Sequence, residues 1–221
     1  MSKRKSAADA PPAKGNERDL RIIGGKFRAS KLTQLYLEKG DDPVTRPMKH
    51  RVREAIFNLV SMEAKGRHAI DLFAGTGALG LEAISRGAAS ATFIERHIPT
   101  ARVVRENIAT IGVGEQCELL EASAFVWAKR DLPTSTCAIP WLVFVSPPYA
   151  FYVERQDDML VLIAALMEHA PAESTLVVEA DERFDFGLLP GGVKEERGDE
   201  GWDVRTYPPA VVGVWRKPLA V

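Results

Sequence analysis

Short apolar runs alternate with longer amphipathic segments from residue 68 onward. The short runs predict strands, and apolar residues that recur every three or four positions predict helices. The predicted strands are 68–71, 91–94, 117–121, 141–145 and 175–179, and the predicted helices are 78–86, 100–111, a short helix after 121, and 154–169. Strands that alternate with helices in this way predict an α/β fold with a doubly wound, mostly parallel sheet.

The two ends of the chain depart from this alternation. Segments 193–197, 203–207 and 211–216 are separated by glycine and proline and predict closing antiparallel strands. Residues 21–28 and 30–33 predict a hairpin around a glycine-containing turn. Thr45-Arg46-Pro47 then opens a predicted helix, whose apolar face comprises Val52, Ala55, Ile56, Leu59 and Val60.

Composition divides the 221 residues into three parts. Residues 1–18 are rich in Ala, Pro and Lys and predict a disordered tail. Residues 19–66 form the hairpin-and-helix extension, and residues 67–221 form the core domain. The whole chain is 46% hydrophobic, which is enough to bury one sizeable core. The two cysteines lack metal-ligand spacing, and the sequence has no signal peptide and no run long enough to span a membrane. We therefore predict a reduced cytoplasmic protein that binds neither a metal nor a membrane, and we expect a monomer.

The net charge of -1 hides an asymmetry between the two parts of the chain. Residues 1–67 hold 16 Lys and Arg against 8 Asp and Glu, whereas the remainder holds 13 against 22. A basic N-terminal extension favours a phosphate-bearing partner, although charges that only interact with solvent are the alternative. The candidate contacts are Lys26, Arg28, Lys31, Arg46, Lys49, Arg51 and Arg53.

A glycine-rich turn follows the first predicted strand and opens the next helix. Its spacing also fits the dinucleotide fingerprint, and a turn that serves only close packing is a further alternative. Asp71, four residues before the first glycine, favours S-adenosylmethionine, because an acid suits its ammonium and the helix N-terminus suits its carboxylate. The candidate cofactor residues of this turn are Asp71, Phe73, Ala74, Gly75, Thr76, Gly77 and Gly80.

Later strand ends add further candidates at the same edge of the sheet. Glu95 ends the second predicted strand, where a carboxylate can accept hydrogen bonds from both ribose hydroxyls and would exclude a 2′-phosphate. A solvated acid at a strand end is the alternative. Arg96 follows it, and Ser123 and Ala124 follow the third strand.

The loop Ser146-Pro147-Pro148-Tyr149 follows the fourth predicted strand. Two prolines restrict the backbone, so that carbonyl groups can be held as acceptors for the hydrogens of an amine. Tyr149 can stack on a base. Methyl transfer to an exocyclic amine needs mainly alignment, so we predict that these four residues form the catalytic loop; an ordinary Pro-Pro turn is the alternative.

These motifs together resemble the RsmD family of bacterial 16S ribosomal RNA guanine-N2 methyltransferases. The resemblance spans roughly residues 20–217 and is carried by 21–25, 45–47, 51–58, 71–83 and the loop 146–149. It implies a class I methyltransferase (Rossmann-like) fold and S-adenosylmethionine, held by residues 75–80 and Glu95. It also implies an RNA-facing extension, a loop that presents guanine, and 16S rRNA in the assembling small subunit as partner.

The chain departs from the family pattern at two serines. Ser146 stands where the family usually has Asp or Asn, and Ser123 stands where an acid or amide approaches adenine. Restoring Asp or Asn at position 146 is therefore expected to raise turnover. The alternative functions are a catalytically weakened RNA-binding assembly factor, an amine methyltransferase for another nucleic acid such as DNA, and a nicotinamide-dependent oxidoreductase.

Overall fold

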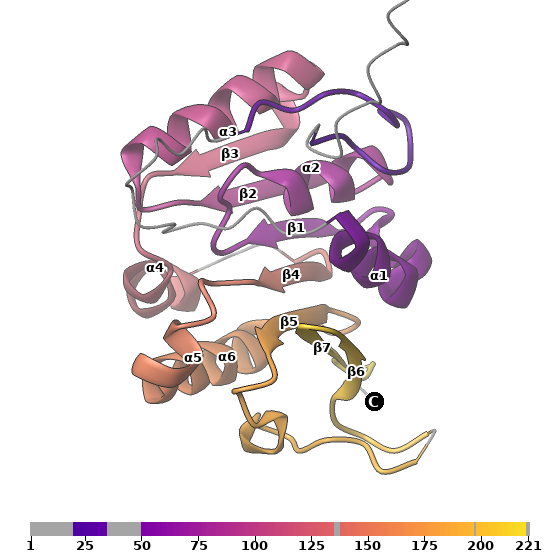
Figure 1. Ribbon diagram of the computed structural model, residues 1–221, viewed down its shortest axis with the longest axis vertical. Helices are drawn as coiled ribbons and strands as arrows, with labels where there is room; N and C mark the ends of the chain where they lie inside the picture. Colours follow the sequence, from indigo (N-terminus) through magenta and orange to yellow (C-terminus); the bar gives the residue numbers. More distant parts are fainter. Residues whose placement is uncertain (1–19, 35–49, 135–137, 197, 220–221) are drawn as a thin grey trace, which may run out of the picture.

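The computed structural model of the protein describes residues 20–34, 50–134, 138–196 and 198–219. Within them, seven strands form one sheet in the order β3-β2-β1-β4-β5-β7-β6 (Figure 1). The first five strands are parallel, and β7 is antiparallel to both β5 and β6. The strands are β1 (His68–Asp71), β2 (Ser90–Ile94), β3 (Cys117–Leu120), β4 (Trp141–Val145), β5 (Thr175–Asp181), β6 (Asp203–Tyr207) and β7 (Ala210–Arg216).

Helices cover both faces of the sheet. They are α1 (His50–Val60), α2 (Ala78–Ser85), α3 (Ile98–Ile111), α4 (Ala124–Arg130), α5 (Phe151–Glu154) and α6 (Gln156–His169). Along β4, Leu142 and Phe144 join the cluster that contains α1, α2 and α3, whereas Val143 and Val145 join the cluster of α4, α5 and α6. Because side chains alternate along a strand, the two clusters lie on opposite faces. The predicted doubly wound sheet is confirmed.

The structure corrects one of the predicted elements and changes the extent of two others. Segment 193–197 is no strand, since the described part of it makes a single isolated bridge from Val193 to Trp202. The N-terminal segments 21–28 and 30–33 fold back on each other as predicted. They share an antiparallel bridge between Arg21 and Lys31 and backbone hydrogen bonds between residues 20–22 and 29–32, but they form no extended strands. The predicted helix 154–169 is confirmed as α6, which begins two residues later at Gln156, and the short helix α5 before it was not predicted. Thr45-Arg46-Pro47 lies outside the described residues.

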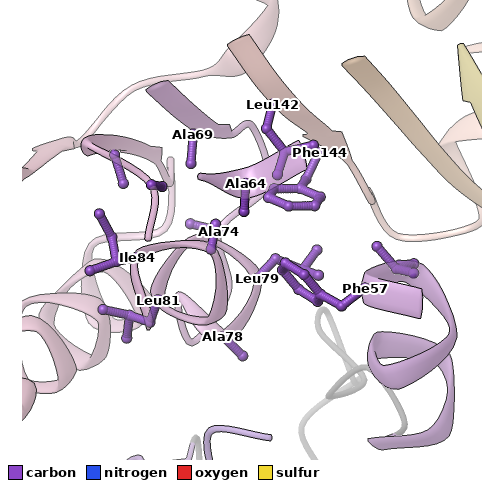
Figure 2. Close-up of a cluster of buried hydrophobic side chains, with 14 of the residues drawn as sticks. Phe57, Ala64, Ala69, Ala74, Ala78, Leu79, Leu81, Ile84, Leu142 and Phe144 are labelled. Atoms are coloured by element: carbon purple, nitrogen blue, oxygen red, sulfur yellow. The ribbon is translucent and has the colours of Figure 1, made fainter. Parts of the chain in front are cut away.

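The N-terminal extension packs into the same core as the sheet. Phe57 of α1 meets Phe144 of β4 with ring centroids 5.6 Å apart, and Leu79 of α2 lies beside Phe57 (Figure 2). The buried carboxylate of Glu82 accepts hydrogen bonds from the backbone amides of Ile23 and Gly24, at 2.7 and 2.8 Å. These contacts fix the segment 20–34 against α2.

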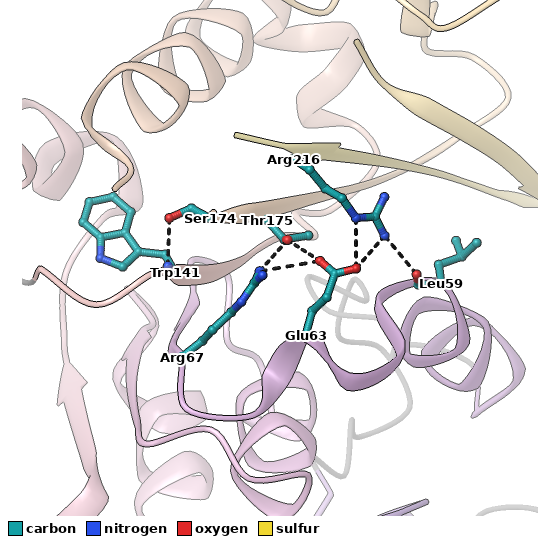
Figure 3. A network of polar contacts seen from close by, with 7 residues as sticks. All are labelled: Leu59, Glu63, Arg67, Trp141, Ser174, Thr175 and Arg216. Atoms are coloured by element: carbon teal, nitrogen blue, oxygen red, sulfur yellow. Dashed lines mark hydrogen bonds and ion pairs between the residues drawn. The ribbon is translucent and has the colours of Figure 1, made fainter. Parts of the chain in front are cut away.

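A polar network joins the extension to the sheet at the opposite end from the strand carboxyl ends. The Glu63 carboxylate, which follows α1, accepts hydrogen bonds from Arg216 of β7 at 2.9 and 2.7 Å (Figure 3). It also accepts a hydrogen bond from the hydroxyl of Thr175, the first residue of β5. The same hydroxyl accepts a hydrogen bond from Arg67. The extension is thereby held at both α2 and the sheet.

None of the helices in the described part of the chain is both long and apolar enough to span a bilayer.

Candidate functional site

Four polar side chains lie on one face of the sheet where the parallel strands end. Two residues before each of them, the strand carries a residue of the hydrophobic cluster that contains α1, α2 and α3. These cluster residues are Ala69, Phe93, Phe144 and Val177. Alternation along a strand therefore directs all four to that same face. They are Asp71, Glu95, Ser146 and Glu179.

The predicted glycine turn lies between β1 and α2 and has the expected backbone. Gly75 and Gly77 have φ of +55° and +77°, in the left-handed region that favours glycine. A Cβ at Gly75 would meet only a backbone oxygen 3.9 Å away, so a ligand can approach the backbone there. A Cβ at Gly80 would lie 2.3 Å from the Phe93 ring, so this glycine instead allows α2 to pack on β2.

Asp71 is almost completely buried beneath this turn. Its Oδ2 accepts a hydrogen bond from the Gly80 amide at 3.1 Å, in the first turn of α2. Burial, together with the nearby charge of Glu95, raises the pKa of Asp71 to about 7, although the Gly80 amide opposes the shift. A cation brought to the remaining oxygen would favour the ionised form.

Glu95 follows β2 and is also buried. Its Oε2 accepts a hydrogen bond from the Gly75 amide at 3.0 Å, and its Oε1 accepts one from the His97 amide at 2.8 Å. Because an ionised carboxylate has about four acceptor positions, two remain for hydroxyl groups. The structure thus joins Glu95 to the glycine turn, as a ribose-binding carboxylate requires.

The other predicted cofactor residues lie in this turn or follow the strands β2 and β3. Ala74 and Ala124 are buried, Thr76 and Ser123 are half-buried, and Arg96 is exposed. Ser123 precedes α4 without capping it through its side chain. Phe73 is half-buried and packs against two aromatic rings at 6.0 and 6.1 Å, from Phe125 and Phe151.

The loop Ser146-Tyr149 leaves β4 and leads into α5, with Pro147 buried and the other three residues half-buried. The Ser146 hydroxyl donates a hydrogen bond to Oε2 of Glu179 on β5. The Tyr149 hydroxyl donates to Oε1 of the same carboxylate at 2.5 Å. Both hydroxyl groups of the loop are therefore held by one carboxylate of the neighbouring strand.

Sequence reasoning missed Glu179, which is 3% exposed. Burial raises its pKa above the ordinary value, and the hydrogen bonds from Ser146 and Tyr149 oppose this shift. The available signal was a single acid within the apolar run 175–180, because a lone acid is rarely buried without a partner. Glu179 also changes the expectation for position 146, since an Asp there would face this carboxylate.

The predicted basic residues differ in exposure. Lys26, Arg28, Lys31 and Arg51 are exposed, whereas Arg46 and Lys49 lie outside the described residues. The prediction for Arg53 is wrong, because its side chain is fully buried and donates to the carbonyl oxygen of Arg21 at 2.5 Å. Arg53 precedes the buried Ile56 and Phe57 by three and four positions, so it lies on the packed face of α1.

Comparison with known proteins identifies relatives over most of the chain. The family model described as "Conserved hypothetical protein 95" matches residues 20–194. Ribosomal RNA small subunit methyltransferase D of Escherichia coli K12 is 37% identical over 130 residues, which are 59% of this chain and 60% of the relative. The chain thus spans about 60% of the length of that relative. The protein of the same name from Haemophilus influenzae is 33% identical over 152 residues, 68% of this chain and 73% of the relative.

Solved structures share the architecture. Escherichia coli yhhF superposes with a TM-score of 0.66 at 26% identity, covering 91% of this chain and 99% of that one. The T. thermophilus 16S rRNA N2 G1207 methyltransferase, RsmC, has a TM-score of 0.62 at 17% identity, covering 90% of this chain and 49% of that one. The fold is therefore the class I methyltransferase (Rossmann-like) fold.

Proposed function

The chain belongs to the RsmD family, whose model is described as conserved hypothetical protein 95, and on that premise we propose that it methylates ribosomal RNA. The donor is S-adenosylmethionine, and the acceptor is the exocyclic N2 of a guanine in 16S rRNA during small-subunit assembly. One observation carries this proposal. The glycine turn and the loop Ser146-Tyr149 follow adjacent strands, β1 and β4, on the same edge of the sheet.

The glycine turn and its two carboxylates fit the cofactor. The open approach to Gly75 admits a ligand against the backbone, and Glu95 retains acceptor positions for ribose hydroxyls. Asp71, which accepts from the Gly80 amide through one oxygen, would pair with the ammonium group through the other, and the N-terminus of α2 would favour the carboxylate. When bound, S-adenosylmethionine supplies an activated methyl group, so the protein need only align the acceptor.

The loop Ser146-Tyr149 provides what an amine acceptor requires. The Tyr149 hydroxyl is bonded to Glu179, so the ring is held at the edge of the site, where it can stack on a base. The carbonyl and hydroxyl oxygens of Ser146 can accept the two amine hydrogens. Guanine N2 is the acceptor that the RsmD resemblance implies, and the names of the two relatives support small-subunit ribosomal RNA.

The exposed cations of the N-terminal extension complete the proposal. Lys26, Arg28, Lys31 and Arg51 would contact phosphates, and the buried contacts of Glu82 hold the segment that carries the first three on α2. A surface of this kind gives salt-dependent binding to RNA. We place Arg46 and Lys49 in the same role by sequence.

Methyl transfer to isolated ribosomal particles tests this function. Small-subunit particles from a strain that lacks the gene would be incubated with the protein and methyl-labelled S-adenosylmethionine, followed by nucleoside analysis. We expect label in N2-methylguanosine of 16S rRNA and none in large-subunit particles or duplex DNA. Tight binding to the particles without any methyl transfer would instead favour the RNA-binding assembly factor.

A further inference from the structure

Glu179 is a buried carboxylate that the proposed function uses only to hold Tyr149, and to which the sequence motifs assign no task. It lies on β5, one strand away from the loop that follows β4. The last printed pair of these strands is Val145 with Val178, so Ser146 and Glu179 are the next residues in register. This register explains why a side chain from β5 reaches the loop at all.

Both partners that the structure gives this carboxylate are hydroxyl groups of the loop. Oε2 accepts from Ser146 Oγ, and Oε1 accepts from Tyr149 Oη at 2.5 Å. A buried carboxylate is costly unless it is hydrogen-bonded, and neutral glutamine has nearly the same volume. A glutamate at this position therefore indicates a role that glutamine cannot perform, and this role acts on the loop Ser146-Tyr149.

We propose that Glu179 is a positioning residue for methyl transfer, because it accepts the protons of both loop hydroxyls and leaves the Ser146 oxygen free to accept a hydrogen from the substrate amine. A serine hydroxyl has one proton and two acceptor positions. With that proton committed to Glu179, Ser146 can act toward the substrate only as an acceptor. The inference rests on the proposed function and gives Ser146 the acceptor role that Asp or Asn has in the family pattern.

The chemical step needs no proton from Ser146 or Glu179. The amine nitrogen forms its bond to the methyl carbon while the carbon–sulfur bond breaks, and sulfur retains the electron pair. The nitrogen is then positively charged, and it releases one of its protons to water as the product leaves. Ser146 and Glu179 keep their own protonation states throughout, so Glu179 acts only by orienting the Ser146 oxygen.

The charge of Glu179 makes this arrangement sensitive to pH. When Glu179 is protonated, its own hydroxyl becomes a donor, and the orientation of Ser146 or Tyr149 reverses. Among the described residues, the ionisable groups that interact with Glu179 are Tyr149 and Tyr152. Asp181 in turn interacts electrostatically with Tyr149. Burial raises the pKa of both tyrosines, so they remain neutral, and burial raises the pKa of Glu179 as well. As the pH is lowered, the methylation rate should therefore begin to decline at a higher pH than it would with an exposed glutamate.

The test compares Glu179→Gln with a matched Glu182→Gln control, whose residue is exposed just beyond β5. Single-turnover methylation of small-subunit particles would be measured across pH, with melting temperature and S-adenosylhomocysteine affinity as separate readouts. We expect Glu179→Gln to lower the neutral rate by about tenfold to a hundredfold, the effect of one well-placed hydrogen bond. The acidic decline of the rate should disappear, while cofactor affinity stays within about twofold and Glu182→Gln matches the wild type.

A double variant distinguishes positioning from a general structural effect. If Glu179 acts through Ser146, adding Ser146→Ala to Glu179→Gln should lower the rate little further than either change alone. If the two effects multiply, the proposal is wrong. Should Glu179→Gln fail to fold, Ser146→Ala must by itself lower the rate to a similar extent and leave cofactor affinity unchanged, and a wild-type rate in that variant also overturns the proposal.

The outcomes separate this inference from the proposed function. If the wild type transfers no methyl group to any particle, the proposed function fails and the inference with it. If the wild type methylates 16S rRNA and Glu179→Gln matches it in rate and pH profile, only the inference fails.

Discussion

The two halves of the site hold their carboxylates in different ways. In the cofactor half, Asp71 and Glu95 are bonded by backbone amides of the glycine turn and of His97. In the acceptor half, Glu179 is bonded by the side chains of Ser146 and Tyr149. Backbone donors persist when neighbouring side chains change, whereas side-chain donors do not. A single substitution in the acceptor half can therefore remove the hydrogen bonds that orient the substrate-binding groups.

The largest expected effect in the cofactor half comes from Glu95→Ala. The change removes the proposed ribose acceptor and the hydrogen bonds to the Gly75 and His97 amides. Charge-assisted hydrogen bonds contribute about 1.5–3 kcal/mol, so S-adenosylmethionine affinity should fall by roughly 10- to 150-fold. Calorimetry measures this, and the rate at saturating cofactor should change much less. Unchanged affinity would remove Glu95 from the site.

Substitutions at Ser146 separate two residues that the family pattern treats alike. Asn can donate its amide hydrogens to Glu179 and offer its oxygen to the substrate, whereas Asp places a second carboxylate against Glu179. We expect Ser146→Asn to equal or exceed the wild-type rate and Ser146→Asp to be about tenfold slower than Ser146→Asn at neutral pH. Equal single-turnover rates for the two variants would contradict the role given to Glu179.

A smaller effect should appear when cofactor binding is followed across pH. If Asp71 pairs with the cofactor ammonium, protonation below its pKa of about 7 weakens binding. Affinity should fall about threefold from pH 7.5 to 6.5 in the wild type. Asp71→Asn, which can still accept from the Gly80 amide, should show only the titration of the ligand itself. An identical decline in both proteins would exclude Asp71 as the ammonium partner.

Asp71 also predicts a pH dependence of folding. Its folded-state pKa, about 7, lies above the ordinary value of 3.8. The fold therefore binds a proton that the unfolded chain has released between these values, so the wild type loses stability as pH rises from about 4 to 7. Denaturant unfolding of the apoprotein should show this loss relative to Asp71→Asn, and parallel curves would contradict the shifted pKa.

The smallest effect on either half is expected from the exposed cations of the extension. Charge reversal at Lys26, Arg28 and Lys31 should leave cofactor affinity and the saturated rate unchanged. Binding to small-subunit particles should weaken, with a salt dependence reduced by roughly 0.7–0.9 in log–log slope for each lost phosphate contact. A salt slope equal to that of the wild type would place the RNA surface elsewhere.

The halves also differ in how far the sequence reveals them. The cofactor half could be predicted because residues 71–80 are contiguous, and the periodicity around them marks a strand, a turn and a helix. The five parallel strands were predicted for the same reason. Glu179 could not be assigned a partner, because its contacts with Ser146 and Tyr149 span 33 and 30 residues and depend on the register of β4 and β5.

The errors elsewhere have equally local causes. Arg53 was assigned to the surface by its charge, although its spacing from Ile56 and Phe57 places it on the buried face of α1. The segment 193–197 lies near glycine breaks and lacks a helical pattern, which predicts a strand, but its described residues make one isolated bridge, from Val193 to Trp202. In both cases tertiary packing outweighed the tendency of the residue type.

One measurement tests whether the cofactor half determines cofactor affinity and the acceptor half determines the maximal rate. Single-turnover rates on small-subunit particles would be determined against S-adenosylmethionine concentration for wild type, Glu95→Gln and Glu179→Gln. We predict that Glu95→Gln requires more cofactor for half-maximal rate but approaches the wild-type maximum. Glu179→Gln should keep the wild-type concentration dependence and reach a maximum at least about tenfold lower. If both variants change the same parameter, the two halves do not perform separate tasks, and the account is wrong.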